Sequence, residues 1–414
     1  MPTLDRRSLL VATAAAAIPA YAADEEYWSG YRGPRGDGSC ASADLPASWS
    51  GSQNLEWKTP LPGRGHASPV IWGNRIFVPA ALEDREERVL ICLDRRNGRT
   101  LWQRTVLKSP LEQIHRLNSY ASSTPLVDRD RVYVPFLDRE EMFVAAYDHG
   151  GNRLWEARPG VFASKHGFST SPVPFKNSII LNGDHDGPGY LTALDRKTGK
   201  TLWKTNRPNN TRSYCTPIIR TLNGKPLLMM SGSKCVAAYD PETGREQWML
   251  DGPTEQFVAA PVFDGKLLFI TTGYPDRHII ALKPDGAGRI TEEQIVWRTR
   301  KGCSYVPAPV LVGNLFFIVS DSGFASCINA ETGDLHWYER LGSGGHSASL
   351  ITSGDRVYFL ADRGIATVVR ASKSYEVLAT NELGEETYAS PAVAPGQLFI
   401  RGVQHLFAIG RPTT

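Results

Sequence analysis

The sequence predicts an all-β protein, an eight-bladed β-propeller whose blades are four-stranded antiparallel sheets. Three observations predict this fold. A unit of about 45 residues, a period typical of propellers, recurs through most of the chain. Each unit contains short apolar runs separated by hairpin-turn residues such as Gly73-Asn74 and Asn223-Gly224. Several units then end in an Asp/Gly turn followed by a strand that carries tryptophan.

Each unit opens with small residues, usually followed by proline. The third positions of these openings lie 56, 47, 45, 44, 48, 40 and 42 residues apart. Small residues suit an inner strand because eight such strands converge on one axis, where bulky side chains would collide. The openings are Ala67-Ser68-Pro69, Ser123-Thr124-Pro125, Thr170-Ser171-Pro172, Cys215-Thr216-Pro217, Ala259-Ala260-Pro261, Pro307-Ala308-Pro309, Ser347-Ala348-Ser349 and Ala389-Ser390-Pro391.

The second half of the unit has its cleanest copy at residues 193–203, which read ALDRKTGKTLW. We expect the Asp195 carboxylate to accept backbone N–H bonds within the turn and Gly199 to take the left-handed conformation that follows. Trp203 is expected to fill the seam between neighbouring blades, where its indole N–H can be donated. The seventh copy, residues 369–378, lacks both the glycine and the tryptophan.

The two ends of the repeat region complement each other. The last copy stops after three strands, at residues 406–409, without a tryptophan strand. An orphan tryptophan strand, residues 54–58 with Trp57, precedes the first opening. We expect this segment to complete the eighth blade, because ring closure removes exposed sheet edges.

The first 22 residues have the pattern of an export signal. Arg6-Arg7 precede an apolar run from Leu9 to Ala20, and Ala20-Tyr21-Ala22 offers small residues for cleavage. Adjacent arginines indicate the twin-arginine route. We therefore expect a signal peptide at 1–22, an extension at 23–53 and the propeller at 54–410. No other stretch has 18 consecutive apolar residues, so we expect no transmembrane segment and a periplasmic or secreted location.

Charge and cysteine content limit the classes of function and of bonding that the chain can have. The net charge of +3 argues against a surface dedicated to nucleic acid. The six cysteines form no CxxC motif and no adjacent pair. In an oxidising compartment Cys215 could pair with Cys235, or Cys303 with Cys327. The alternative is that all six are small buried residues on strands.

A ligand site is expected where the residues just before the openings ring one mouth of the central channel. Convergent aromatic and polar groups around a concave mouth are typical of ligand sites, although such residues can also merely cap a channel. The candidate ligand-binding residues are Arg64, His66, Tyr120, His166, Arg212, Tyr214, Tyr305, His346, Glu386 and Tyr388, with Phe257 beside them.

Two patterns invite a metal-site interpretation, and we predict no metal at either. His66, His166 and His346 hold similar offsets before their openings, but they belong to the first, third and seventh blades. Ligands of one ion must converge on it, so these three are expected to lie too far apart. The loop at residues 182–187 (NGDHDG) has oxygen ligands but too few carboxylates for Ca²⁺, which favours an ordinary polar turn.

The turn-and-tryptophan pattern of residues 193–203 resembles the blade signature of the pyrroloquinoline-quinone-type propeller repeat family. The resemblance covers residues 54–410, and residues 28–38 resemble the start of exported proteins of this type. It implies either a scaffold like BamB of outer-membrane protein assembly or a quinoprotein alcohol dehydrogenase. The dehydrogenases of the family have an adjacent-cysteine disulfide, a bound calcium and an aspartate base. This chain has no adjacent cysteines and no matching catalytic segment, so no catalytic residue is assigned.

Three functions stay open from the sequence. The first is an exported, non-enzymatic scaffold or binding protein of the cell envelope, without a cofactor, that binds a protein or small ligand at the channel mouth. The second is a dehydrogenase with a degenerate site for pyrroloquinoline quinone and Ca²⁺. The third is a hydrolase or lyase acting on envelope polysaccharide, for which no paired-carboxylate pattern is present.

Overall fold

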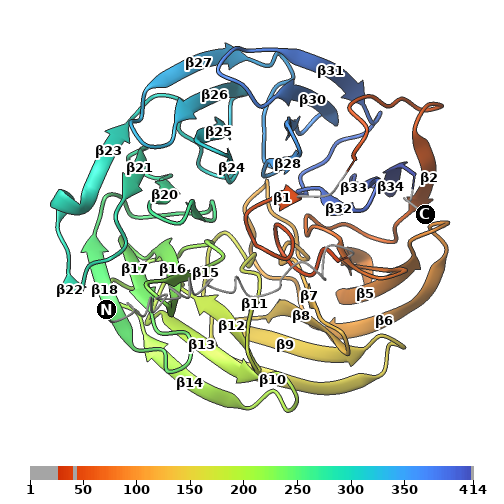
Figure 1. Cartoon of the computed structure of the whole chain (residues 1–414). Helices are drawn as coiled ribbons and strands as arrows, with labels where there is room; N and C mark the ends of the chain where they lie inside the picture. The colour runs from red at the N-terminus through yellow and green to blue at the C-terminus, as the bar shows by residue number, and fades with distance from the viewer. Residues whose placement is uncertain (1–26, 41–43, 412–414) are drawn as a thin grey trace, which may run out of the picture.

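The computed structural model describes residues 27–40 and 44–411, and these form a ring of eight β-sheets around one axis (Figure 1). The predicted signal peptide, residues 1–22, lies outside the described residues. Besides the strands, the described ranges contain only two three-residue 3₁₀ turns, η1 (Glu83–Arg85) and η2 (Glu292–Gln294). The predicted all-β, eight-bladed propeller is confirmed.

The first four blades follow the chain from the axis outward, and each pairs its strands in sequence order. Blade 1 has β3 (Val70–Trp72), β4 (Arg75–Leu82), β5 (Glu87–Asp94) and β6 (Thr100–Lys108). Blade 2 has β7 (Leu126–Val127), β8 (Arg131–Asp138), β9 (Glu141–Asp148) and β10 (Arg153–Val161). Blade 3 has β11 (Val173–Phe175), β12 (Ser178–Gly183), β13 (Tyr190–Asp195) and β14 (Thr201–Asn206). Blade 4 has β15 (Ile218–Leu222), β16 (Lys225–Gly232), β17 (Cys235–Tyr239) and β18 (Glu246–Asp251).

The other four blades repeat the plan with local additions. Blade 5 has β19 (Val262–Phe263), β20 (Leu268–Thr271), β21 (Ile279–Leu282) and β23 (Ile295–Thr299), and its long third turn sends β22 (Gly288–Arg289) to the edge of β18. Blade 6 has β24 (Val310–Val312), β25 (Leu315–Val319), β26 (Phe324–Asn329) and β27 (Leu335–Arg340). Blade 7 has β28 (Ile351–Ser353), β29 (Arg356–Leu360), β30 (Ile365–Arg370) and β31 (Val377–Glu382). Blade 8 has β32 (Ala392–Ala394), β33 (Gln397–Arg401) and β34 (His405–Gly410).

The turn and the tryptophan of the repeat act together across each blade seam. In the clean copy, Asp195 Oδ1 accepts N–H bonds from Lys197 and Thr198 at 3.0 and 2.8 Å. Gly199 has φ +72°, and a Cβ there would lie 2.5 Å from the ring of Trp155 in the preceding blade. The Trp155 indole N–H donates to Arg196 O at 3.0 Å. This position therefore requires glycine for two reasons: the backbone is in the left-handed conformation, and the Trp155 ring leaves no space for a Cβ.

The N-terminal strand closes the ring as predicted. β2 (Leu55–Pro60) pairs antiparallel with β34, with Trp57 opposite Ala408 and Lys58 opposite Phe407. Trp57 donates its indole N–H to Arg95 O in blade 1 at 2.9 Å. The seam between blades 8 and 1 thus has the same contact as a seam between two consecutive repeats.

The seam between blades 7 and 8 is sealed differently, because the seventh repeat lacks its tryptophan. Trp49, from the segment before β2, is buried in the same apolar cluster as the partly buried Leu378. The Asn381 side chain fixes this segment, accepting from Trp49 N at 2.8 Å and donating to Ala47 O at 2.9 Å. A residue outside the repeat thus supplies the missing tryptophan.

Residues 27–40, which we call the N-terminal plug, cross the channel, an arrangement that the sequence analysis did not predict (Figure 1). Trp28 bridges Ile71 of blade 1, and Val127 of blade 2 donates its N–H to Ser29 O at 2.7 Å. At the other end of the plug, β1 (Ser39–Cys40) pairs parallel with β28 of blade 7. The plug therefore ties together blades far apart in sequence.

The cysteines lie mostly in the interior of the blades. Cys40 is partly buried, and the other five, Cys92, Cys215, Cys235, Cys303 and Cys327, are buried and form no disulfide in the part of the chain that the structure describes. No helix within residues 27–40 and 44–411 is long and apolar enough to span a membrane.

Candidate functional site

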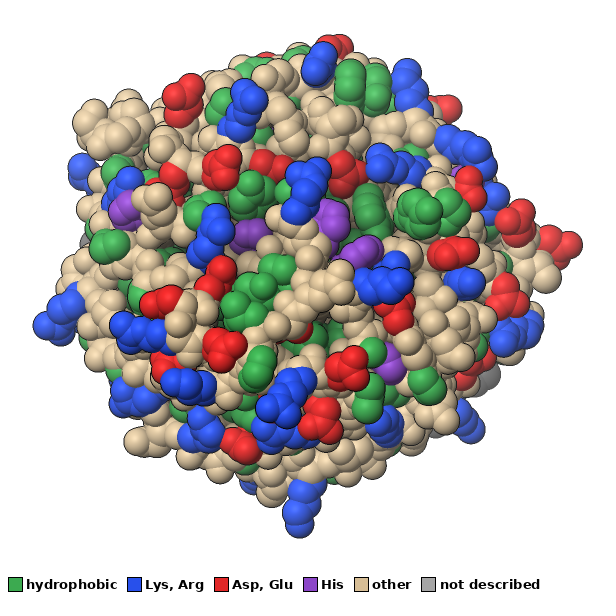
Figure 2. Space-filling view, turned by 180° about the vertical axis from the view of Figure 1, so that it is seen from behind, with side chains coloured by type: hydrophobic (Ala, Val, Ile, Leu, Met, Phe, Trp, Pro, Cys, Tyr) green, Lys and Arg blue, Asp and Glu red, His purple; other side chains and the backbone are tan. Residues whose placement is uncertain are grey.

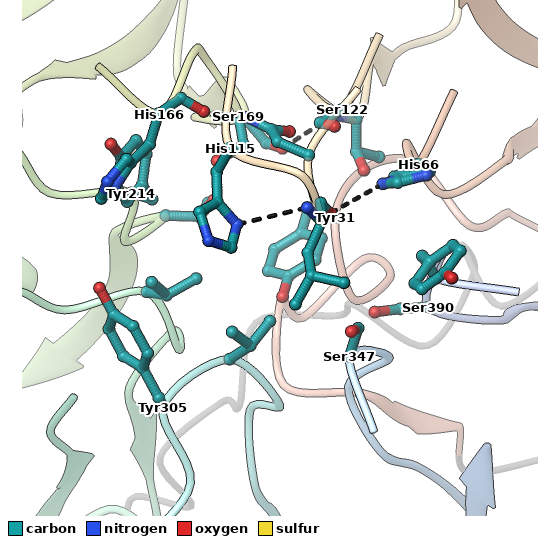
Figure 3. Close-up of a pocket in the computed structure, with 18 of the residues that line it drawn as sticks. Tyr31, His66, His115, Ser122, His166, Ser169, Tyr214, Tyr305, Ser347 and Ser390 are labelled. Carbon is teal, nitrogen blue, oxygen red and sulfur yellow. Dashed lines mark hydrogen bonds between the residues drawn. The ribbon is translucent and has the colours of Figure 1, made fainter. Parts of the chain in front are cut away.

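A cavity of about 400 Å³, here called the axial cavity, lies at the centre of the ring (Figure 3). This volume lies within the range of small-molecule sites, about 300–1,000 Å³. Much of the lining comes from residues at or just before the blade openings, whereas Trp28 and Ser29 of the plug contact Ile71 and Val127, which lie further along the inner strands. One end of the channel is therefore occupied by the plug, and the cavity faces the other end.

Tyr31 of the plug forms part of the cavity lining, and its ring packs beside Ala259, Ala260 and Ala308 of blades 5 and 6. Its hydroxyl shares a 2.9 Å hydrogen bond with Ser349 Oγ of blade 7. The alanine openings of blades 5 and 6 thus leave room that Tyr31 fills.

Arg32 anchors the plug next to Tyr31. Its guanidinium donates to Asp37 O at 2.7 Å and to Pro309 O of blade 6, and the side chain is buried. Burial lowers the pKa of Arg32, but its guanidinium stays charged because arginine does not lose its proton in proteins. Two backbone carbonyls therefore hold a buried cation at the closed end of the channel.

The wall of the cavity is formed by hydroxyl side chains from the blade openings. Thr124 Oγ1 accepts the Ser68 N–H, and Ser171 Oγ accepts the Thr124 N–H, both at 3.0 Å. Ser390 Oγ accepts the Ser349 N–H at 2.9 Å. Each hydroxyl therefore ties two blades together while its own proton stays available to a ligand.

The rim of the cavity is a set of aromatic and imidazole rings. His66 packs on Tyr388 with ring centroids 4.6 Å apart, and His115 meets the edge of His166 at 5.4 Å. His166 in turn stacks on Tyr214 at 6.2 Å. Histidine and apolar side chains gather near the centre of this face of the molecule (Figure 2). The rim thus offers flat surfaces around a polar interior.

His66 and His166 of the rim are mainly neutral near pH 7. Burial, with the positive charges of Arg401 and Arg64, lowers the pKa of His66 to about 4. Burial, together with Arg212 and His115, also lowers the pKa of His166. His66 Nδ1 lies 3.1 Å from Leu117 O, which can only accept, so Nδ1 carries the proton and Nε2 is an acceptor.

The long connection between β6 and β7, residues 109–125, supplies part of the rim. Its base is fixed by the buried Arg88, which pairs with Glu112 and donates to Ser109 O. Its tip crosses to blade 3, where Asn118 Nδ2 donates to His166 O at 2.6 Å. This connection accounts for the 56-residue spacing between the first two openings.

Of the ten residues predicted to bind a ligand, the structure brings five together at the cavity, namely His66, His166, Tyr214, Tyr305 and Tyr388. The other five do not line it. Arg64 is exposed and pairs its backbone with Ala81, and Tyr120 lies against Arg88. Arg212 pairs with Asp186 at 2.5 Å, His346 is buried with its Nδ1 3.2 Å from Gly344 O, and Glu386 is exposed beside the Tyr388 hydroxyl.

Sequence reasoning missed His115, Asn118, Arg277, Asp321 and Tyr31, all of which line the cavity. His115 and Asn118 lie in the extra length of the first unit, and the spacing of 56 residues was a signal that could have found them. Arg277 and Asp321 follow the second strands of their blades, on the mouth side. Tyr31 lies outside the repeat, and no periodic pattern marks it.

The charged groups of the lining neutralise each other. Arg277 and Asp321 are the charged side chains that line the axial cavity within the described ranges, and they lie 3.7 Å apart. The Asp321 carboxylate also accepts the backbone N–H groups of Tyr305 and Val306 at 2.8 and 3.0 Å. This carboxylate therefore serves mainly to fix the rim.

The loop at residues 182–187 is a polar turn, since both of its carboxylates are engaged by arginines. Asp184 forms a fully buried, two-pronged pair with Arg207, at 3.0 and 3.1 Å. Asp186 pairs with Arg212. Across residues 27–40 and 44–411, no group of three or more His, Cys, Asp or Glu side chains is placed to hold a metal ion.

The ring of blades with its Asp/Gly turns and tryptophan seams defines a β-propeller of the pyrroloquinoline-quinone-type repeat class. Residues 47–158, 187–291 and 288–381 match the family model described as outer membrane protein assembly factor BamB. The chain belongs to this family.

Individual relatives share about a quarter of their residues with this chain, over about half of its length. The chain is 26% identical over 235 residues to tetrathionate hydrolase of Acidithiobacillus ferrooxidans, a match of 55% of this chain and 45% of that protein. It is 24% identical over 211 residues to BamB of Alkalilimnicola ehrlichii, 49% of this chain and 51% of that protein. The chain thus spans about half the length of these two relatives.

Among solved structures, quinohemoprotein alcohol dehydrogenase from Comamonas testosteroni superposes with a TM-score of 0.66 at 13% identity, covering 95% of this chain and 83% of that one. This similarity is one of fold.

The carboxylates that line the axial cavity do not fit the calcium site that the family resemblance implies for its dehydrogenases. Ca²⁺ takes about six to eight oxygen ligands, usually with several carboxylates. Asp321 is the carboxylate that lines the axial cavity in the described chain, and two backbone amides and Arg277 already occupy it. The buried thiols are also poor reactive groups, since burial raises the pKa of Cys215 and Cys303 to about 11.

Proposed function

We propose that this chain is an exported binding protein of the cell envelope that holds a ligand in the axial cavity without catalysing a reaction. The observation that carries the proposal is the axial cavity itself. Its hydroxyls and rings converge on one space, while its charged residues are engaged with each other and with the backbone. Such a lining offers shape and hydrogen bonds, and none of its described Ser or Thr hydroxyls is hydrogen-bonded to a histidine that could activate it as a nucleophile.

The description of the matched family is compatible with a binding role, and the relatives also include an enzyme, tetrathionate hydrolase. The matched family is described as an outer membrane protein assembly factor, and BamB of Alkalilimnicola ehrlichii carries that name. A protein partner that docks on the same mouth face is compatible with a ligand in the cavity. The cavity would then help to recognise a group that the partner presents.

Export is part of the proposal and rests on the sequence. Arg6 and Arg7 precede the apolar run of residues 9–20. A fusion of residues 1–30 to green fluorescent protein, which must fold before twin-arginine export, should reach the periplasm of a host with that system. Replacing both arginines by lysine should keep the fusion in the cytoplasm. Equal export of both fusions would contradict the twin-arginine route.

The dehydrogenase alternative is tested directly on the purified protein. Pyrroloquinoline quinone at about 100 µM with excess Ca²⁺ would report a site of even modest affinity. The protein is titrated by absorbance and assayed with ethanol and a dye that accepts electrons. We expect no spectral change and no dye reduction. Cofactor-dependent dye reduction would overturn the proposal in favour of a quinoprotein dehydrogenase.

A further inference from the structure

Apart from Arg277, which lies 3.7 Å from the Asp321 carboxylate, the free hydrogen-bonding groups that line the axial cavity in the described chain are uncharged. Thr124, Ser171 and Ser390 each accept one backbone N–H and keep their own protons for a ligand. Thr216 lines the same wall, and its hydroxyl has no hydrogen-bond partner within the part of the chain that the structure describes. The wall therefore presents several hydroxyl donors, each of which can also accept.

The imidazoles add one acceptor and one donor of fixed identity. His66 donates from Nδ1 to Leu117 O, which leaves Nε2 as an acceptor. His115 Nδ1 accepts the Leu117 N–H at 3.3 Å, so in the neutral ring the proton sits on Nε2. The backbone N–H and C=O of one residue, Leu117, thus favour opposite tautomers in two rings of the rim (Figure 3). A ligand that fits both must itself donate and accept.

The rings of the rim offer flat apolar faces beside these polar groups. His66 and Tyr388 form one ring pair, and Tyr214 continues the His115–His166 pair on another side. Tyr305, with its hydroxyl bound to Gln256 Oε1 at 3.1 Å, and Tyr31 complete the set. Rings whose polar ends are already bound leave their faces as the contact surface.

An anionic ligand matches this lining less well than a neutral one. The Arg277 guanidinium at the cavity faces Asp321, and Arg212 nearby pairs with Asp186. Arg401 is buried behind His66, where its Nη1 donates to Ala67 O, and it does not line the cavity. Because the Asp321 carboxylate offsets the charge of Arg277, the cation that lines the cavity within the described residues, an anion gains little there.

We propose that the axial cavity is a binding site for an uncharged saccharide, a mono- or disaccharide or the end of a neutral glycan chain. Sugar rings have hydroxyl edges that both donate and accept, and C–H faces that pack on aromatic rings. These features match the hydroxyl wall and the ring-lined rim. The inference rests on the proposed function, since it names the class of ligand for the same cavity.

The first arm of the test uses calorimetric titration of the full mature protein. The probes are glucose, galactose, N-acetylglucosamine, cellobiose, maltose and chitobiose, with sodium glucuronate and sodium sulfate as charged counterparts. We expect at least one neutral sugar to bind with a Kd tighter than about 5 mM, a modest affinity for a ligand of this size. Glucuronate should bind more weakly than glucose.

The second arm locates the binding. Thr216→Val keeps the shape of the side chain and removes its free hydroxyl, so the Kd of the bound sugar should rise about tenfold. Tyr388→Ala, which removes one rim ring, should raise it by a similar factor. Thr100→Val changes an exposed threonine of β6 and should leave the Kd within about twofold, the level expected of a site without contact.

The outcomes distinguish failure of the saccharide proposal from failure of the proposed binding function. If no neutral sugar binds, or if Thr216→Val and Tyr388→Ala leave its Kd unchanged, the saccharide site is wrong. If sulfate or glucuronate alone binds, and Tyr388→Ala weakens it, the cavity is a ligand site of another class and the proposed function stands. If pyrroloquinoline quinone binds with turnover, both proposals fall.

Discussion

The two ends of the central channel are built in different ways. At the plug end, Trp28 and Arg32 are buried, with Trp28 held by backbone bonds to blade 1 and Arg32 by its guanidinium bond to Pro309 O of blade 6. At the mouth, Tyr388 is partly exposed and His115 is exposed, with their rings packed on His66 and His166. The plug end therefore contributes to the stability of the ring, and the mouth can change its ligand contacts at little cost in folding free energy.

The largest expected effect comes from the plug. Trp28→Ala removes a side chain that is 2% exposed within the core cluster that joins blades 1, 7 and 8. Loss of a buried tryptophan should lower the free energy of unfolding by about 3–5 kcal/mol. Urea denaturation followed by circular dichroism measures it. A loss below about 1 kcal/mol would mean that the plug does not support the ring.

The next effect is a pH dependence of the free energy of unfolding, which arises from two buried histidines. Burial lowers the pKa of both His66 and His346 to about 4, below their usual value of 6.5. The unfolded chain therefore binds more protons, and stability is full above pH 6.5 and is lost as the pH falls toward 4. Between pH 7 and 5 we expect a loss of about 1–2 kcal/mol for each imidazole.

Urea denaturation across this pH range measures the effect, and His346→Gln is the informative variant. It should make the decline between pH 7 and 5 shallower, while Thr100→Val should follow the parent protein. An unchanged slope in His346→Gln would show that this imidazole is not kept neutral by the fold.

A smaller effect is expected at the base of the mouth connection. Glu112→Gln leaves the buried Arg88 without its carboxylate, although Arg88 still donates to Ser109 O and Pro110 O. We expect a loss of about 1–3 kcal/mol, the range for a hydrogen bond to a charged group. Proteolysis should also increase within residues 109–125 before the rest of the ring is cut. Uniform proteolysis of the whole chain would contradict a local anchor.

The smallest effect on stability is expected at the rim itself. Tyr388→Ala should change the free energy of unfolding by less than about 1 kcal/mol, because the residue is partly exposed and packs mainly on His66. The same urea experiment as for Trp28→Ala gives the comparison. Equal losses in the free energy of unfolding for the two variants would contradict a difference in stability between the two ends of the channel.

The repeat explains which parts of this structure were predictable. Gly199, Trp155 and Trp57 recur at fixed positions because every blade seam needs the same contact, so the blades and their closure follow from the spacing. The plug follows no period, and its place depends on long-range bonds such as that of Arg32 to Pro309. Such bonds leave no local pattern in the sequence.

The candidate site was likewise predictable from the repeat only in part. His66 and Tyr214 directly precede their openings, His166 lies a few residues before its own, and all three line the cavity, so position before an opening was a useful guide. Arg212 and His346 also lie just before openings but turn to Asp186 and to Gly344 O. Which way a rim side chain points is decided by the partner available in the neighbouring loop, and the repeat does not encode that partner.

Hydrogen exchange of the peptide that covers residues 27–40, followed by mass spectrometry in the full-length protein, tests the central claim most directly. Closure of the channel by the plug predicts slow exchange at Trp28 and Gly38, whose N–H groups donate to Ile71 O and Arg32 O. Their protection should approach that of the blade strands. Exchange as fast as that of a free peptide would show that the channel is open at both ends, and the blind ligand cavity would have to be abandoned.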